Sequence, residues 1–201
     1  MKITILVEGA TERVFLPPLR DFLKRHLTQM PSLSVRPYDG RIPKGDKLRR
    51  IVEDLLTKRP TSDAVIALTD VYTGTSDFAD AADAKAKMNE WVGGNKRFHP
   101  HVAQHDFEAW LLPFWPTIQK LAKHNLRAPS GPPEQVNHGN PPARRIKEIF
   151  ERGKCRDSYV KPRDALRILR DNDLSVAIEA CPELKALVNT ILRLSGGKLL
   201  P

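Results

Sequence analysis

Cysteine is scarce in this sequence, with two among 201 residues. Cys155 and Cys181 are too few for a disulfide framework, and they lack C-x-x-C spacing. This excludes a scaffold stabilised by disulfides. It suits a reducing compartment, in which both residues would be structural thiols.

Long apolar runs are absent as well. Residues 64–68, one of the longest, fall far short of the roughly 18 residues that a membrane span requires. The apolar N-terminal segment reaches Glu8 before a signal peptide could form. We therefore expect a cytoplasmic protein with no membrane association. A G-x-x-x-x-G-K-[ST] run is also missing, so we expect no ATP hydrolysis by this chain.

The overall composition is typical of a globular chain. Hydrophobic residues make up 40% and charged residues 28% of the sequence, which excludes the disordered and collagen-like classes. The 201 residues suffice for one domain, or for a domain with an appendage, and for a sizeable core.

Positive charge is in excess and is clustered. The net charge is +9, and residues 144–170 hold ten basic against four acidic residues. A helix start disfavours cations, so basic residues at the start of a helix near residue 144 suggest a bound polyanion. The candidate nucleic-acid contacts are Arg144, Arg145, Lys147, Lys154, Arg156, Lys161 and Arg163. The alternative is an ordinary solvated charged face.

Apolar patterning predicts alternating strands and helices in the first half of the chain. The expected strands are residues 2–7, 33–38, 64–69 and 99–105. Helices are expected from an N-cap at Thr11, along 48–56, over 77–91 and from 107, with Pro17 and Pro18 kinking or delaying the first. This order is typical of an α/β fold with a mainly parallel sheet flanked by helices.

The second half of the sequence has a different pattern. Residues 127–143 are polar and contain five prolines, which indicates an ordered loop or a boundary. Helices are expected over 142–151, 163–169 and 182–194. We therefore predict a core at 1–126, a proline-rich loop at 127–143, and a basic helical extension at 144–201 that packs on the core.

Acidic residues stand where the predicted strands end. Glu8, with Glu12 four residues on, follows the first strand, Asp70 ends the third, and Asp106 and Glu108 follow the fourth. Carboxylates at the ends of neighbouring parallel strands can converge on one divalent ion, and Mg²⁺ prefers such oxygen ligands. Gly9 would allow a sharp turn and close approach of a phosphate.

Each acid also has an ordinary structural interpretation. Glu12 could favour the first helical turn through the helix dipole, Asp70 could be a turn or cap residue, and Glu108 could be a solvated helix residue. The joint arrangement favours a site.

These residues carry a resemblance to a known family. Residues 8–12, with the sequence E-G-A-T-E, and the later strand ending at Asp70 resemble the TOPRIM fold, in which an E-G-x-T-E-like motif and a D-x-D motif bind catalytic magnesium. More closely, the chain resembles small TOPRIM-like proteins related to the overcoming-lysogenization-defect (OLD) nucleases. The shared pieces are residues 7–13, 70–72, 107–111, 142–146 and 159–161.

The resemblance implies a TOPRIM-like, Rossmann-like fold and a metal-dependent nuclease that cuts DNA or RNA. It also implies an ABC-type ATPase partner and a role in defence against phage. Mg²⁺ or Mn²⁺ would be held by Glu8, Asp70 and Glu108, with Glu12 as a further ligand or a base. Lys161 would stabilise the transition state or the leaving oxygen, or would be a plain surface contact to phosphate.

One position departs from the family pattern. Tyr72 stands where the second aspartate of D-x-D would complete a metal site, and a phenol does not replace a carboxylate. Asp77 or Asp106 could supply the missing oxygen, and the number of metal ions stays open. The rival interpretation is a catalytically silent nucleic-acid-binding or regulatory subunit. A nucleotidyl transferase of the primase kind is disfavoured because no priming or zinc-ribbon module is present. A homo-oligomer is possible.

Two further patterns have simple interpretations. His99, His101 and His105 share one strand face, but no carboxylate or thiolate matches their spacing, so zinc is disfavoured. His105 could still act in proton transfer. The tryptophans, with Phe107 and Phe114, are expected to pack the core rather than to stack on bases.

Overall fold

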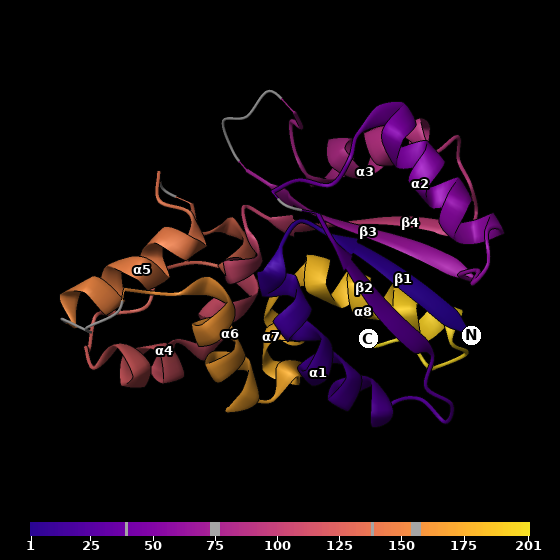
Figure 1. Ribbon diagram of the computed structural model, residues 1–201. Helices are drawn as coiled ribbons and strands as arrows, with labels where there is room; N and C mark the ends of the chain where they lie inside the picture. Colours follow the sequence, from indigo (N-terminus) through magenta and orange to yellow (C-terminus); the bar gives the residue numbers. More distant parts are fainter. Residues whose placement is uncertain (39, 73–76, 138, 154–157) are drawn as a thin grey trace.

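A computed structural model describes residues 1–38, 40–72, 77–137, 139–153 and 158–201 (Figure 1). Four parallel strands form one sheet in the order β2-β1-β3-β4. Their bounds are β1 Lys2–Val7, β2 Ser32–Pro37, β3 Ala64–Val71 and β4 Phe98–Gln104. The predicted α/β class with a parallel sheet is confirmed.

The inner strands are buried on both faces, as their apolar sequences require. In β1, Ile3 and Ile5 pack into one apolar cluster and Leu6 packs into another. The first cluster is covered by α1 (Ala10–Lys24) and α8 (Pro182–Leu194), and the second by α2 (Gly45–Thr57) and α3 (Ala81–Trp91). Figure 1 shows these two helix layers on opposite sides of the sheet.

The chain beyond β4 is helical. It forms the 3₁₀ helix η1 (Phe107–Phe114), α4 (Trp115–Ala122), a short η2 (Pro133–Gln135), α5 (Pro142–Arg152), α6 (Lys161–Arg170), α7 (Leu174–Ala180) and α8. Side chains from these helices share the apolar cluster of α1 and the sheet. The helical C-terminal part is confirmed, and α8 packs against β4, while the division into a core, a loop and an extension stays a prediction.

The first helix differs from the expectation in two ways. It begins at Ala10 with Gly9 as N-cap and runs unbroken through Pro17 and Pro18, so Thr11 is not its cap and the prolines do not delay it. Its apolar face, which includes Phe15 and Leu19, is buried, and this packing stabilises the helix where the prolines remove backbone hydrogen bonds.

Three other expectations need correction. Residues 77–80 precede the third helix, which begins at Ala81 because the side chain of Asp80 caps it by accepting from the Asp83 N–H. Residues 107–112 form a 3₁₀ helix rather than an α-helix. Gly9 is extended, with φ −153°, so its freedom at positive φ is not used for a turn. No helix in the described ranges combines the length and apolarity of a membrane span.

Candidate active site at the carboxyl edge of the sheet

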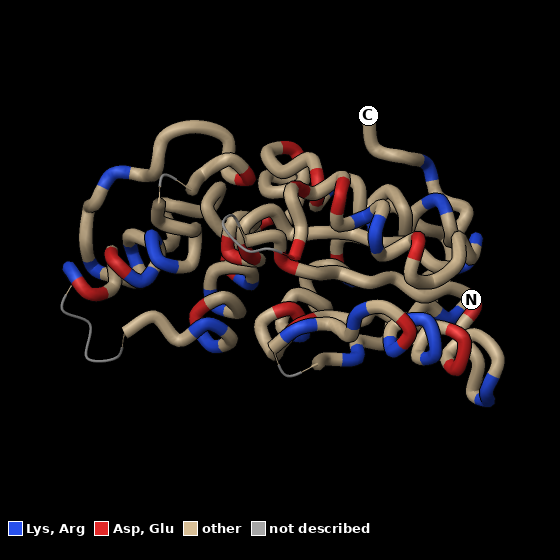
Figure 2. The backbone as a smooth tube through the Cα atoms, turned by 90° about the horizontal axis from the view of Figure 1, so that it is seen from above, with Lys and Arg blue, Asp and Glu red and all other residues tan. Residues whose placement is uncertain are grey.

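The carboxyl ends of β1, β3 and β4 meet at one edge of the sheet, beside α5 and α6 (Figure 1). Glu8 follows β1, Asp70 is the last residue but one of β3, and Asp106 comes two residues after β4. Figure 2 shows acidic positions near the middle of the tube, between groups of basic positions. Parallel topology therefore gathers these acids from distant parts of the sequence.

Glu8 is bound to the neighbouring strand. Its Oε1 accepts hydrogen bonds from the hydroxyl of Thr69 and from the backbone N–H of Asp70, the latter at 3.2 Å. Burial raises the pKa of Glu8 and the charge of Glu12 adds to this, while the two hydrogen bonds act in the opposite direction. The carboxylate is thus fixed in place through one oxygen, and the other is the one that could turn to a ligand.

Asp70 and Tyr72 form a pair at the end of β3. The Tyr72 hydroxyl donates to Asp70 Oδ2 at 2.9 Å. Burial raises the pKa of Asp70 well above its usual range, and the charges of Glu8, Glu12 and Asp106 add to the effect. The phenol therefore orients Asp70 from the position where the family motif has a second aspartate.

Asp106 is a buried carboxylate with one oxygen that accepts no hydrogen bond from the described residues. Its side chain is buried, its Oδ2 accepts from the Ala143 N–H at 3.1 Å, and its Oδ1 has no hydrogen-bond partner among the described residues. Burial and the charge of Glu108 raise its pKa to about 7. An orphaned buried oxygen is costly, so a site for a cation or a proton donor is indicated here.

His105 sets the direction of the chain at Asp106. It has φ 69°, in the left-handed region, and its N–H donates to the Val71 carbonyl at 3.0 Å. The chain therefore turns sharply between β4 and η1. Burial lowers the pKa of His105, which favours the neutral ring.

Glu108 is held by two partners from the C-terminal region. The Tyr159 hydroxyl donates to its Oε1 at 3.3 Å, and Lys161 Nζ lies 3.2 Å from its Oε2. Burial alone would lower the pKa of Lys161, but the carboxylates of Glu108, Asp106 and Asp70 outweigh it and hold the pKa above its usual value. Both oxygens of Glu108 are therefore engaged, and Lys161 is a cation at the site.

Glu12 completes the group. It is buried in the first turn of α1, where burial and the charge of Glu108 raise its pKa while the backbone amides of Glu12 and Gly9 act in the opposite direction. Its position suits both a role at the site and the helix-dipole interpretation.

A cleft of about 750 Å³ opens beside these carboxylates. Its lining includes three carboxylates and three cations: Asp106, Glu148 and Glu151, and Arg144, Lys147 and Lys161. Tyr72 and Tyr159 also line it. A phosphate in this cleft would meet both cations and carboxylates, a combination typical of sites that bind phosphate together with a metal ion.

The predicted basic residues are divided by the fold. Arg144, Lys147 and Lys161 line the cleft, whereas Arg145 does not. Arg163 is paired with the buried Asp164, through Nη2 at 3.0 Å. Lys154 and Arg156 lie outside the described residues.

The family of the chain follows from comparison with known proteins. The model described as Domain of unknown function (DUF4276) matches residues 7–192. The chain belongs to the DUF4276 family. A search of curated proteins gives no match.

Among solved structures, this DUF4276 protein resembles the C-terminal region of the Burkholderia pseudomallei OLD protein. The TM-score is 0.58 and the identity 16%, over 96% of this chain and 98% of that one. The C-terminal region of the Xanthomonas campestris pv. campestris OLD protein, phased with iodine, gives a TM-score of 0.48 at 15% identity, over 96% of both chains. At this identity the Burkholderia likeness establishes the fold, and the Xanthomonas likeness carries no further argument.

The candidate donors of the DUF4276 protein are carboxylate oxygens, the ligand type that hard divalent ions prefer. Within the described residues, no group of three or more His, Cys, Asp or Glu side chains is arranged to hold a metal. Mg²⁺ needs less, because it keeps several waters and uses one or two carboxylates with substrate phosphates. Asp70 and Asp106 supply two carboxylates, of which Asp106 raises the pKa of Asp70 by its charge. One oxygen of Asp106 has no partner among the described residues.

The sequence pattern indicates Asp106 only as a substitute for a missing ligand. Its place directly after a predicted strand and before the F-E-A-W-L segment is the sequence feature that marks it as a candidate ligand in its own right. His101 has an ordinary hydrogen-bond partner in the core, since its Nε2 lies 3.0 Å from Thr190 Oγ1 on α8. As expected, the aromatic side chains pack in the core: Phe107, Trp110, Phe114 and Trp115. Trp91, at the end of α3, is partly buried against the second apolar cluster.

Proposed function

We propose that this protein is a Mg²⁺- or Mn²⁺-dependent nuclease that hydrolyses phosphodiester bonds in DNA or RNA. The observation that carries the proposal is a cleft that Asp106 shares with the cations Arg144, Lys147 and Lys161. One oxygen of Asp106 has no hydrogen-bond partner among the described residues. Carboxylates and cations gathered in one cleft suit a phosphate and a divalent ion bound together. The TOPRIM-type OLD relationship expected from the sequence supports the same reaction class.

In this proposal Asp70 and Asp106 hold the metal, with the second oxygen of Glu8 and the carboxylate of Glu12 as further ligands. When bound, the ion would activate a water and neutralise charge on the phosphate. Tyr72 keeps Asp70 in one orientation. Glu108 positions Lys161, whose ammonium group would stabilise negative charge on the phosphate or on the leaving oxygen.

Arg144 and Lys147 have a different task. They lie one turn apart on α5 and line the cleft, so they can contact successive phosphates and fix the register of the strand. A role as the effector of an anti-phage system under an ABC-type ATPase is part of the proposal. Its support is the resemblance in the sequence motifs.

The test uses purified protein with plasmid DNA and with total tRNA, in Mn²⁺ or in EDTA. Asp106→Asn removes the charge at nearly the same shape, and Glu179→Gln removes an exposed carboxylate from α7 as the matched control. We expect cleavage that requires Mn²⁺, is lost in Asp106→Asn and is kept in Glu179→Gln. Cleavage that survives in EDTA would overturn the metal dependence.

A specific observation favours a second candidate, the catalytically silent nucleic-acid-binding subunit. Tyr72 occupies Asp70 with a hydrogen bond, and the described carboxylates do not form a closed metal site. For this candidate we expect nucleic-acid binding without any Mn²⁺ bound through Asp106. Calorimetric Mn²⁺ titration of wild type and Asp106→Asn separates the two candidates even when no cleavage occurs.

A further inference from the structure

A second basic cluster lies on the opposite side of the carboxylates from α5. Arg41 and Lys44, between β2 and α2, both form ion pairs with the carboxylate of Asp77. We call these three residues the Asp77 cluster. The cations, with Lys44 first, lower the pKa of Asp77. The sequence patterns assign no role to Arg41 or Lys44.

The cluster holds more positive charge than its internal partner needs. One cation satisfies one carboxylate, but here two share it, and a third, Lys87, also acts on its charge. The side chains of Arg41 and Lys44 stay 51% and 40% exposed. Exposed ion pairs contribute little to stability, with a median of about 0–1 kcal/mol. Arg41 and Lys44 are therefore accessible to an external anion, and their pairing with Asp77 adds little stability that such binding would cost.

Lys44 and Lys87 are held in place by an aromatic ring as well as by acids. Each ammonium group lies 5.9 Å from the centroid of Phe78. Lys87 is paired with Asp83 at 2.8 Å. Positioned cations lose less side-chain entropy on binding a phosphate than free ones do.

The Asp77 cluster is continuous with the candidate active site. Arg41, Lys44 and Asp77 line a small hollow together with Glu8, Asp70 and Tyr72. Tyr72 also lines the large cleft that holds Asp106, Arg144 and Lys147. The two depressions therefore adjoin at Tyr72, with the carboxylates between the two sets of cations. Arg41 is close enough to lower the pKa of Glu8.

We propose that the Asp77 cluster is a second phosphate-binding site, which holds the same nucleic-acid strand on the far side of the carboxylates. The strand would cross the edge of the sheet from Arg144 and Lys147, past Tyr72, to Arg41 and Lys44. This inference rests on the proposed nucleic-acid substrate and adds the path of that substrate. A strand held at both ends would place an internal phosphodiester, rather than a terminal one, at Asp70 and Asp106.

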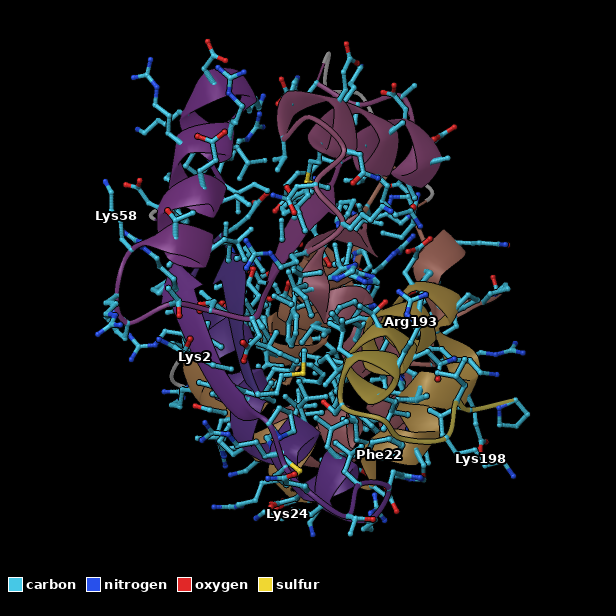
Figure 3. The ribbon with its side chains drawn as sticks, turned by 90° about the vertical axis from the view of Figure 1, so that its right-hand side faces the viewer. Lys2, Phe22, Lys24, Lys58, Arg193 and Lys198 are labelled. Atoms are coloured by element: carbon cyan, nitrogen blue, oxygen red, sulfur yellow. The ribbon has the colours of Figure 1, made fainter. Side chains whose placement is uncertain are left out.

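The test measures binding in EDTA, so that cleavage plays no part. Labelled single-stranded DNA and RNA oligonucleotides of one sequence are titrated by fluorescence anisotropy at several salt concentrations. The variant is Arg41→Gln with Lys44→Gln, compared with Arg144→Gln with Lys147→Gln in the cleft. The control is Arg193→Gln with Lys58→Gln, which removes the same charge from exposed positions on α8 and at the end of α2. Figure 3 shows Lys58 pointing away from the molecule.

We expect both the cleft variant and the Asp77-cluster variant to bind a long oligonucleotide on the order of tenfold more weakly at low salt, because each variant neutralises about two phosphates fewer. The slope of log K against log salt should become shallower by about 0.7 for each phosphate of a single strand that is no longer neutralised. The control should match the wild type. A dinucleotide reaches only one side, so its binding should be lost in the cleft variant alone.

Asp77→Asn provides the opposite change. It removes the carboxylate that pairs with both cations and keeps the cations themselves. The long oligonucleotide should therefore bind the Asp77→Asn variant more tightly than it binds the wild type. This expectation does not depend on a destabilised variant, and thermal melting confirms folding in each case. If the Asp77-cluster variant matches the control while the cleft variant is weakened, this inference is wrong and the proposed function stands. If wild type binds neither oligonucleotide, both are wrong.

Discussion

Lys161 Nζ lies 3.2 Å from Glu108 Oε2, which joins the first turn of α6 to a fully buried carboxylate in η1. The two residues are 53 positions apart in the sequence. The pair has two consequences that can be separated: it satisfies Glu108, and it presents a cation to the cleft.

Lys161→Gln should lower both stability and activity. In this variant Glu108 keeps its hydrogen bond from Tyr159 but loses its ion pair with Lys161. A buried group left partly unsatisfied costs about 1–3 kcal/mol of stability. Urea unfolding measures this loss, and turnover at saturating substrate measures the catalytic one.

The double variant Lys161→Gln with Glu108→Gln separates the two effects. It removes the uncompensated charge, so much of the lost stability should return, while turnover should stay low because the cation is still absent. Turnover equal to that of wild type in either variant would show that Lys161 has no role in the reaction.

Tyr72→Phe tests whether the phenol positions Asp70. Removal of the hydroxyl leaves the packing of the ring and deletes the 2.9 Å hydrogen bond to Oδ2. Loss of such an orienting partner typically weakens metal binding about 10- to 100-fold. Mn²⁺ titration followed by electron paramagnetic resonance gives the affinity. An unchanged affinity would mean that Asp70 is oriented without Tyr72, or that it does not bind the ion.

The sequence predicts where the acidic residues of this site meet, but not which hydrogen bonds their oxygens make. β1 and β3 are apolar runs ended by acids, and parallel topology then requires Glu8 and Asp70 to meet at one edge. Nothing local shows which carboxylate oxygen is left without a partner. Asp106 and Ala143 are 37 positions apart, and it is the packing of α5 against η1 that leaves one oxygen of Asp106 unsatisfied by the described residues.

The basic segment shows the same limit. Charge counting groups Arg144, Arg145 and Arg163 together, but successive residues on a helix point in directions about 100° apart. Arg144 therefore lines the cleft while Arg145 does not, and Arg163 is paired with Asp164. The sequence indicates Asp77 only as a substitute metal ligand, whereas the structure pairs it with Arg41 and Lys44, which are 33–36 positions away and are each ordinary surface charges in the sequence.

Glu134→Ala should destabilise the fold without touching the cleft. The buried Glu134 accepts from Trp110 Nε1 at 2.9 Å and from the Glu183 N–H at the start of α8 at 3.0 Å. Removal leaves a buried indole donor and an uncapped helix start, at a cost of about 3 kcal/mol. Glu134→Gln keeps an acceptor and should lose less. Equal melting temperatures for wild type and Glu134→Ala would show that these two hydrogen bonds do not stabilise the fold.

His101 should make the fold less stable in acid. Burial, and then the charges of Lys85, His99 and Arg193, lower its pKa to about 3 in the folded state, against about 6.5 in an unfolded chain. Between these values the unfolded chain binds the additional proton, so this residue's contribution to stability falls as the pH drops below 6.5. From pH 7 to pH 5 the loss is about 2 kcal/mol, provided that the folded pKa stays below 5.

The variant His101→Gln isolates this effect, because glutamine keeps a partner for Thr190 and cannot titrate. Urea unfolding of wild type and His101→Gln is compared at pH 7 and pH 5, and the carboxylates are common to both proteins. We expect the free energy of unfolding to fall further in wild type than in the variant. Parallel pH dependence in the two would show that His101 accepts a proton in the folded state as readily as in the unfolded one.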